Sequence, residues 1–194
     1  MKVAIVKYNA GNTASVVNAL LRLGVEPVVT DDADALQNAD KVIFPGVGEA
    51  STAMRYLRER NLDAVIKSLT QPVLGICLGM HLMCAASDEN ETTCLGIVPN
   101  RVRKLVSDKL KIPHTGWNRI DHNSSPLFSG VADGSHVYFV HGYFVEPGID
   151  TTATCDYGQK FSAALDAGNF YAVQFHPEKS GATGARILEN FLKI

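Results

Sequence analysis

A cysteine between two glycines is the residue of this sequence best suited to act as a nucleophile. Cys77 lies in the stretch Gly75–Gly79, directly after the apolar run Val73–Ile76 and before a helical pattern. A sharp strand-to-helix turn favours glycine on either side of the nucleophile, because side chains there would hold strand and helix apart. At the start of a helix, the dipole and the free N–H groups favour the thiolate, and the N–H of Leu78 is placed to bind an oxyanion. The pattern therefore predicts nucleophilic catalysis by Cys77.

Two other roles are compatible with a cysteine at this position. A free cysteine is most often a small buried residue without chemistry, but the preceding strand, the two glycines and the following helix favour the reactive role. Cys77, His81 and Cys84 also follow one another at i, i+4 and i+7, on one face of a helix. Cys77 would however lie on the turn, and a second group of ligands with zinc-like spacing is missing. We therefore expect no metal here.

A histidine with a carboxylate two positions later provides the base that such a nucleophile needs. In His176-Pro177-Glu178, the proline favours extended backbone at His176, and residues i and i+2 of an extended segment project to the same side. Glu178 can then hold one ring nitrogen while the other faces the thiol. The other candidates, His114 and His141, have no acidic residue two positions away. A strand-end histidine followed by a helix-capping glutamate is the alternative interpretation.

A glycine-containing loop, Pro45–Glu49, follows another short apolar run. Glycines before a helix can cradle phosphate, but the dinucleotide fingerprint needs a third glycine at the position of Ser51 and belongs in the first strand-to-helix turn. Acyl transfer needs a second N–H donor for the oxyanion, typically worth about 10²–10³ in rate. We therefore interpret this loop as part of an oxyanion site.

The first half of the chain must position these motifs through alternating strands and helices. Short apolar runs predict strands at 3–6, 25–29, 42–44 and 73–76, and helical spacing predicts helices at 13–23, 50–58, 62–69 and 78–86. Asn12 or Thr13 is expected to cap the first helix and Gly24 to end it. This order predicts a mostly parallel, doubly wound sheet with helices on both faces.

The second half has a different pattern, mainly of short strands. We expect them at 96–106, 112–119, 136–145, 151–157, 161–165 and 170–175, with a hairpin loop at Asp166–Asn169 and a last helix at 181–192. The expected fold is α/β, with the doubly wound sheet followed by an antiparallel, strand-rich second half in a single domain, 1–194. Because the carboxyl ends of parallel strands gather at one edge, Cys77 and His176 are expected to meet there.

The composition excludes several classes of partner. Of 194 residues, 46% are hydrophobic and 20% charged, and 18 basic against 20 acidic residues give a net charge of −2. This balance argues against a dedicated nucleic-acid or anionic-membrane binder. No apolar run approaches the roughly 20 residues of a membrane-spanning helix, and Met1–Lys7 does not resemble a secretory signal. We expect a cytoplasmic protein with four reduced cysteines: Cys77, Cys84, Cys94 and Cys155.

Taken together, the motifs resemble those of the class I, or triad, glutamine amidotransferases. Gly75–Met80 and His176–Glu178 carry this general resemblance. Three further stretches are similar to one subgroup, the glutaminase subunits of imidazole glycerol phosphate synthase: Pro45–Gly48, Pro113–Asn118 and Tyr138–Tyr143. The resemblance runs from Val3 to the last helix and includes the loop Asn9–Asn12.

The resemblance implies an activity and a set of residues for it. Cys77 would attack the carboxamide of glutamine, His176 would transfer protons and Glu178 would orient the imidazole. The implied oxyanion group is Gly46, Val47, Gly48 and Leu78, and the implied glutamine-binding group is His81, Glu89, His141, Gly142 and Tyr143. The residues implied at a partner interface are Pro113, Trp117 and Asn118, for which plain core or turn packing is the alternative.

The implied partner is a (β/α)₈-barrel cyclase that forms a heterodimer with the glutaminase. It would use the ammonia to make imidazole glycerol phosphate and an aminoimidazole carboxamide ribotide in histidine biosynthesis, and nucleotide binding at the cyclase would stimulate the glutaminase. The chemistry needs no cofactor.

The sequence departs from the family pattern at three positions. His81 stands where glutamine is usual, Gly142 where serine or threonine is usual, and Lys7 where aspartate is common. Two alternatives remain open: the glutaminase subunit of another ammonia-using synthase, and a catalytically idle regulatory subunit. The Gly-Val-Gly loop and Trp117-Asn118 disfavour the first, and the complete catalytic set disfavours the second.

Overall fold

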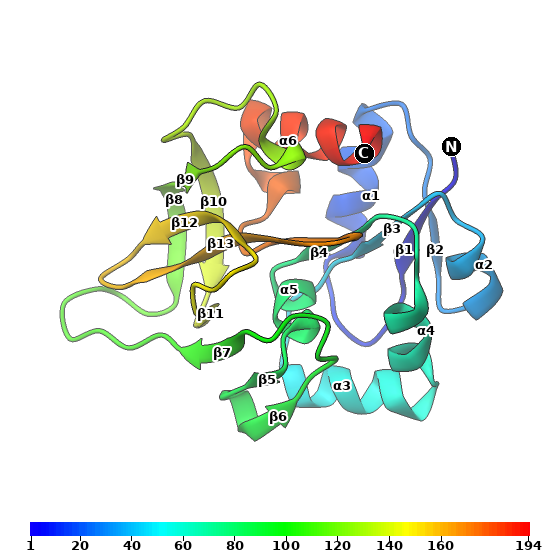
Figure 1. Ribbon diagram of the computed structural model, residues 1–194, viewed down its shortest axis with the longest axis horizontal. Helices are drawn as coiled ribbons and strands as arrows, with labels where there is room; N and C mark the ends of the chain where they lie inside the picture. The colour runs from blue at the N-terminus through cyan, green and yellow to red at the C-terminus, as the bar shows by residue number, and fades with distance from the viewer.

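The computed structural model describes residues 1–194 (Figure 1). Its helices are α1 (Thr13–Arg22), α2 (Ala33–Gln37), α3 (Ala50–Glu59), α4 (Leu62–Ser68), α5 (Leu78–Met83) and α6 (Gly181–Lys193), with 3₁₀ turns at Glu89–Glu91, Pro126–Phe128 and Pro177–Lys179. Its strands are β1 (Val3–Val6), β2 (Val28–Thr30), β3 (Lys41–Phe44), β4 (Val73–Ile76), β5 (Ala86–Ser87), β6 (Thr92–Thr93), β7 (Arg101–Lys104), β8 (His114–Arg119), β9 (Asp121–His122), β10 (His136–His141), β11 (Tyr143–Val145), β12 (Thr151–Asp156), β13 (Lys160–Ala167) and β14 (Phe170–Val173).

The strands form one large mixed sheet and one small antiparallel sheet. The large sheet has 12 strands and runs in the order β2-β1-β3-β4-β14-β13-β11-β7-β5-β6, with β12 paired to β13 and β9 paired to β12. Strands β2, β1, β3, β4 and β14 pair in parallel, whereas β14, β13 and β11 pair antiparallel. Strands β8 and β10 form the small sheet. The expected parallel half followed by a strand-rich half is confirmed.

Helices cover both faces of the parallel strands. Figure 1 shows α1 and α6 on one face and α3, α4 and α5 on the other. Alternate residues of β1 enter two separate buried clusters: Ala4 and Val6 pack with α2 to α5, and Val3 and Ile5 pack with α1 and α6. This two-sided burial explains the continuous apolar runs of the parallel strands.

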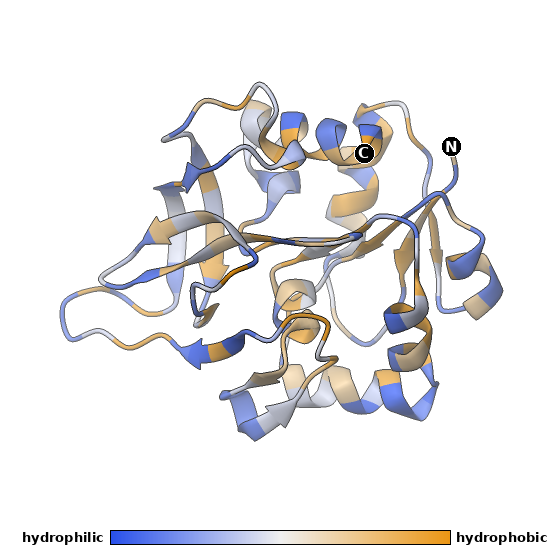
Figure 2. Cartoon of the chain, viewed as in Figure 1, coloured by the Kyte–Doolittle hydropathy of each residue, from blue (hydrophilic) through white to orange (hydrophobic).

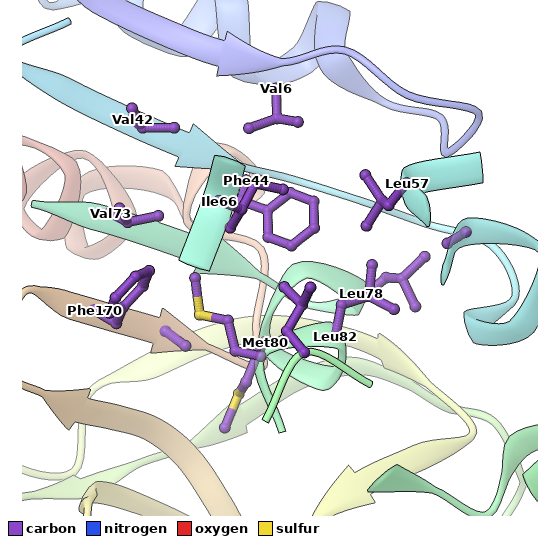
Figure 3. Close-up of a cluster of buried hydrophobic side chains, with 14 of the residues drawn as sticks. Val6, Val42, Phe44, Leu57, Ile66, Val73, Leu78, Met80, Leu82 and Phe170 are labelled. Carbon is purple, nitrogen blue, oxygen red and sulfur yellow. The ribbon is translucent and has the colours of Figure 1, made fainter. Parts of the chain in front are cut away.

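The first of these clusters fills the space under the sheet with interdigitated side chains. Figure 3 shows Phe44 of β3 lying among residues of the neighbouring strands and of α3, α4 and α5, including Ile66, Leu78 and Met80. These side chains are all at least 97% buried. The packing fixes α5 against β3, and the first residue of α5 follows Cys77 directly.

The hydropathy of the chain follows the same layers. Figure 2 shows apolar residues along the central strands, whereas α3 carries apolar and polar residues on different sides. No helix of the structure combines the length and apolar character needed to cross a membrane.

Several elements differ from the expectations of the sequence. The short helix α2 is an addition, and the segment expected as one strand over 136–145 is two strands, β10 in the small sheet and β11 in the large one, with Gly142 between them. Within the segment 96–106 only Arg101–Lys104 is a strand. The residues before this strand instead donate their N–H groups to the carbonyls at the end of α5; the N–H of Ile97, for example, donates to the carbonyl of Met83 at 2.9 Å. Because these carbonyls are bound by a distant segment, α5 ends earlier than expected.

Candidate active site

Cys77 occupies a strained turn between β4 and α5. Its backbone has φ 52° and ψ −105°, a conformation that residues other than glycine rarely adopt. A Cβ atom at Gly79 would collide with the carbonyl oxygen of Phe44, and one at Gly75 would lie 2.9 Å from the sulfur of Met83 and 3.0 Å from the backbone of Gly79. The expected need for glycine on both sides of the nucleophile is confirmed, and such strain is typical of functional positions.

The base candidate, His176, follows β14, the strand that pairs with β4 directly before Cys77. Strands β4 and β14 pair in parallel with Gly75 opposite Ala172 and Ile76 opposite Val173, and the N–H of Cys77 donates to the carbonyl of Val173 at 2.8 Å. Both strands therefore deliver their next residues to the same edge of the sheet, as expected for ligand-binding edges of parallel sheets.

His176 and Glu178 form a buried pair at that edge. The Nδ1 of His176 lies 2.8 Å from Oε1 of Glu178, with side chains exposed by 1% and 0%. Its Nε2 is buried without a hydrogen-bond partner. Burial alone would lower the pKa of His176, but the Cys77 sulfur and the Glu178 carboxylate outweigh burial and raise it from 6.5 to about 10. The geometry leaves Nε2 free for proton transfer.

Asn12 supports Glu178 rather than the first helix. Its backbone is left-handed, with φ 76°, and its side chain makes no cap hydrogen bond to α1. Its Nδ2 instead donates to Oε1 of Glu178 at 3.0 Å. The expectation that Asn12 caps α1 is therefore wrong, and Thr13 is simply the first residue of that helix.

The loop Pro45–Gly48 lies against the start of α5. Gly46 has no room for a side chain, because a Cβ atom there would collide with the hydroxyl of Tyr8, which donates to the carbonyl of Pro45 at 2.6 Å. The carbonyl of Val47 accepts from the N–H of Gly11 at 3.2 Å. The N–H of Leu78, expected to face an oxyanion, donates to the carbonyl of Gly46 at 3.2 Å. In this conformation the Leu78 amide is therefore already bound.

A cavity of about 240 Å³ opens beside the sulfur of Cys77. All five residues of the expected glutamine-binding group line it: His81, Glu89, His141, Gly142 and Tyr143. Its remaining walls are Val47, Gly48, Cys77, Leu78, Pro113 and Val140. The structure thus brings together the nucleophile, most of the expected oxyanion group and the complete expected pocket, whereas Gly46, His176 and Glu178 lie outside the cavity walls.

Two carboxylates place negative charge near one end of this cavity. Glu49 caps α3 by accepting from the N–H groups of Ser51 and Thr52, both at 2.9 Å. These bonds outweigh its burial and lower its pKa to about 2. Glu89 accepts from the N–H of Ala50 at 2.8 Å, and burial, opposed by this bond, raises its pKa. Because the pocket wall includes Glu89, a positively charged ligand group is favoured there.

A chain of hydrogen bonds joins the small sheet to the cavity. Nδ1 of His114 lies 3.0 Å from Nε2 of His141, and Nδ1 of His141 lies 2.8 Å from the carbonyl of Tyr143. Burial lowers the pKa of His114 to about 4 and that of His141 to about 3, so both rings are neutral at pH 7. His141 must then donate through Nδ1 and accept through Nε2, which makes His114 a donor through Nδ1. Asn118 approaches the remaining nitrogen of His114 at 3.4 Å.

The residues expected at a partner interface lie on or beside the small sheet. Trp117 is 56% exposed and packs edge-on against Tyr138, with ring centroids 6.1 Å apart. Asn118 donates to the carbonyl of Asp156 at 3.0 Å, and Pro113 belongs to the cavity wall. An exposed tryptophan excludes the alternative that Trp117 is a core residue.

The metal-ligand alternative for Cys77, His81 and Cys84 is not supported. No group of three or more His, Cys, Asp or Glu side chains is arranged to hold a metal ion. His81 instead binds Gln174, with Nε2 and Oε1 at 2.7 Å, and Cys84 donates to the carbonyl of Met80 at 3.4 Å. Gln174 was missed by the sequence reasoning, although its place two residues before His176 on the same extended segment was a usable signal.

The comparisons with known proteins agree with this geometry. Residues 4–194 match the family model described as glutamine amidotransferase class-I. The imidazole glycerol phosphate synthase subunit HisH of Bacteroides thetaiotaomicron is 57% identical over 196 residues, and that of Escherichia coli is 47% identical over 196 residues, each covering 100% of both chains.

Solved structures show the same fold at low sequence identity. A glutamine amidotransferase structure superposes with a TM-score of 0.77 at 18% identity, covering 100% of this chain and 98% of that chain. The structure of PurLQS from Thermotoga maritima gives a TM-score of 0.73 at 18% identity, covering 99% of this chain and 97% of that chain. The chain therefore belongs to the class I glutamine amidotransferases and, within them, to the HisH subunits of imidazole glycerol phosphate synthase.

Proposed function

We propose that this chain hydrolyses glutamine to glutamate and ammonia and passes the ammonia to a cyclase subunit. The cyclase would use it to make imidazole glycerol phosphate and an aminoimidazole carboxamide ribotide in histidine biosynthesis. The observation that carries the proposal is the joint placement of Cys77 and the buried His176–Glu178 pair after adjacent parallel strands, beside one cavity. Full-length similarity to HisH subunits supports it.

The reaction has two halves. The Cys77 thiolate adds to the carboxamide carbon of glutamine, and the tetrahedral intermediate expels ammonia as His176 gives a proton to the departing nitrogen. A water that gives a proton to His176 then adds to the thioester carbon, and glutamate leaves as the sulfur takes back its electron pair. Glu178 keeps the ring oriented through Nδ1, so that Nε2 faces the reacting groups.

The oxyanion of each intermediate requires N–H donors that face the cavity. We assign this role to Leu78 and to the loop Gly46–Gly48. Because the N–H of Leu78 donates to the carbonyl of Gly46 at 3.2 Å, that bond must open before Leu78 can bind an oxyanion. The glutaminase is therefore expected to be slow in the conformation described above.

The walls of the cavity suit an amino acid. Glu89 offers a carboxylate to the ammonium group, while His81, His141, Gly142 and Tyr143 surround the remainder of the substrate. Glycine at position 142 leaves room on that side, since nothing lies within 4 Å of the place where a Cβ atom would be.

Glutamine hydrolysis is one half of the overall reaction and the use of the ammonia is the other, so a protein partner is part of the proposal. We propose a heterodimer in the cytoplasm with a (β/α)₈-barrel cyclase, docked at the surface that includes Pro113, Trp117 and Asn118. Ammonia in water is largely protonated and no longer nucleophilic, which favours a sheltered transfer from the glutaminase to the cyclase.

Measurement of glutamate release tests the proposal. The purified chain is assayed with glutamine alone, with the cyclase, and with the cyclase and its nucleotide. We expect stimulation by the loaded cyclase that is absent in Cys77→Ala and retained in the matched control Cys155→Ala. Full activity in Cys77→Ala contradicts the assigned nucleophile, and a cyclase that neither binds nor stimulates contradicts the assigned partner.

A further inference from the structure

Gln174 lies completely buried between His81 and the sulfur of Cys77. Its Nε2 donates to Sγ of Cys77 at 3.8 Å, and its Oε1 lies 2.7 Å from Nε2 of His81. Gln174 directly follows β14, and its own N–H donates to the carbonyl of Ala163 at 2.9 Å. The amide is thus held on a paired backbone and contacts both neighbours at once.

The hydrogen-bond partners decide which way the amide points when the sulfur is ionised. A thiolate only accepts hydrogen bonds, so the amide must present its NH₂ group to the sulfur and its oxygen to His81. Burial, opposed by the bond to Gln174, lowers the pKa of His81 to about 4, so its ring is neutral at pH 7. A neutral ring that carries its proton on Nε2 then donates to Oε1. With its proton on Nε2, His81 holds the amide in the orientation that a thiolate needs.

The other hydrogen bond of the sulfur favours the opposite protonation state. As a thiol, Cys77 donates to the carbonyl of Val140 at 3.9 Å, which stabilises the neutral form. The N–H of Leu78 is bound to Gly46, and Nε2 of His176 makes no hydrogen bond. The charge of His176, whose pKa the sulfur raises, favours the thiolate from one side, and the amide of Gln174 adds an N–H donor to the sulfur in this conformation.

We infer that Gln174 is a positioning residue that stabilises the Cys77 thiolate through its amide NH₂ group, and that His81 holds this amide in the required orientation. The inference rests on the proposed function, because it assigns the amide to the nucleophile of that reaction. It also gives the histidine at position 81, where the family usually has glutamine, a structural task in addition to its place in the cavity wall.

The pH dependence of Cys77 alkylation by iodoacetamide tests this inference without using glutaminase activity. The full chain is labelled between pH 5 and 10, and the modified peptide is identified by mass spectrometry. Burial raises the pKa of the other three thiols, Cys84, Cys94 and Cys155, so they react more slowly. The titratable groups facing Cys77 are His176, Tyr8, His81 and His141, and all remain in the Gln174 variants.

We expect Gln174→Leu to move the midpoint of the alkylation profile upward by about one pH unit, which is a tenfold lower thiolate fraction at neutral pH. His81→Leu should move it in the same direction by less, because the amide remains but can rotate. His81→Gln should keep the midpoint of the parent chain, since the amide of a glutamine at position 81 can also donate to Oε1 of Gln174. The double variant with leucine at both positions should shift no further than Gln174→Leu alone.

An unchanged midpoint in folded Gln174→Leu, with the circular dichroism and Tm of the parent chain, overturns the inference. If that variant does not fold, Gln174→Glu takes its place: it keeps the shape and the bond to His81 but presents an oxygen to the sulfur. It should raise the midpoint by more than one pH unit, which is a more than tenfold lower thiolate fraction at neutral pH. An unchanged midpoint again overturns the inference. Failure of the proposed function is recognised separately, by glutamate release that persists in Cys77→Ala.

Discussion

Replacement of Glu178 by glutamine isolates the charge of the carboxylate that orients the base. The amide keeps the shape of the side chain and an oxygen that can accept from Nδ1 of His176 and from Nδ2 of Asn12, which now bind Oε1 at 2.8 and 3.0 Å. What is lost is the attraction between the carboxylate and the imidazolium that forms when His176 takes up a proton.

The size of this loss follows from the burial of the pair. The side chains of His176 and Glu178 are exposed by 1% and 0%, so water screens their interaction little. Two unit charges about 4 Å apart at an effective dielectric constant of 20 attract by about 4 kcal/mol. The amide retains a neutral hydrogen bond worth about 1 kcal/mol, which leaves about 3 kcal/mol, or roughly a 100-fold loss in rate.

The assay is glutamate release at saturating glutamine, with the cyclase and its nucleotide present. We expect kcat of Glu178→Gln to fall about 100-fold, and KM to change little because Glu178 is not part of the cavity wall. The control is Glu189→Gln, the same chemical change on a side chain of α6 that is 37% exposed and paired with Arg186. A kcat within threefold of the parent value in folded Glu178→Gln would refute the reasoning.

Three further predictions concern the turn, the base and the pocket. Gly79→Ala should lower Tm by about 3–10 °C, because the methyl group collides with the carbonyl of Phe44 and overpacking costs about 1–3 kcal/mol; thermal unfolding measures it. The contribution of His176 to stability should be complete below about pH 6.5 and be lost as pH rises toward 10, because its pKa is raised on folding; urea unfolding of the parent and His176→Gln at pH 6 and pH 9.5 measures it. Glu89→Gln should raise KM for glutamine about tenfold with kcat kept, because it removes a charge from the pocket wall; steady-state kinetics measure it.

Each of these has its own contradicting result. Gly142→Ala, with open space around the new Cβ atom, is the control for the turn and should leave Tm within about 2 °C; equal losses in both glycine variants contradict the steric argument. A stability difference between parent and His176→Gln that grows from pH 6 to pH 9.5 contradicts the sign of the shift. An unchanged KM in Glu89→Gln removes Glu89 from ammonium binding.

The parallel half of the fold was predictable because its signals are local. Strands β1, β3 and β4 are buried on both faces, so their sequences are continuous apolar runs that need no knowledge of the partner strand. The turn at Cys77 was also predictable, because its glycines are required by the close approach of α5 to β3 and β4. The pairing of His176 with Glu178 depends only on neighbouring residues of one extended segment.

The features that the sequence did not reveal depend on distant partners. Helix α2 has five residues and too short an apolar pattern, although its cap, Asp32, accepts from the N–H of Ala35 at 2.8 Å and was a usable signal. The division of 136–145 at Gly142 depends on which strands lie alongside. The hydrogen bond from Leu78 to Gly46 is likewise set by tertiary packing. The types of the two residues fit an oxyanion site and do not reveal that they bind one another.

The pairing of β4 with β14 also has a consequence for how the enzyme is made. The nucleophile at position 77 and the base at position 176 become neighbours only when the last strand of the sheet inserts beside β4. Such long-range pairing forms late and slowly compared with local turns and helices. A nascent chain that ends before β14 contains the cysteine but no base, so glutamine hydrolysis by this route must wait until β14 and His176 have been synthesised. Activity therefore reports that β14 has been inserted into the sheet, and chains that end before His176 release no ammonia by this route.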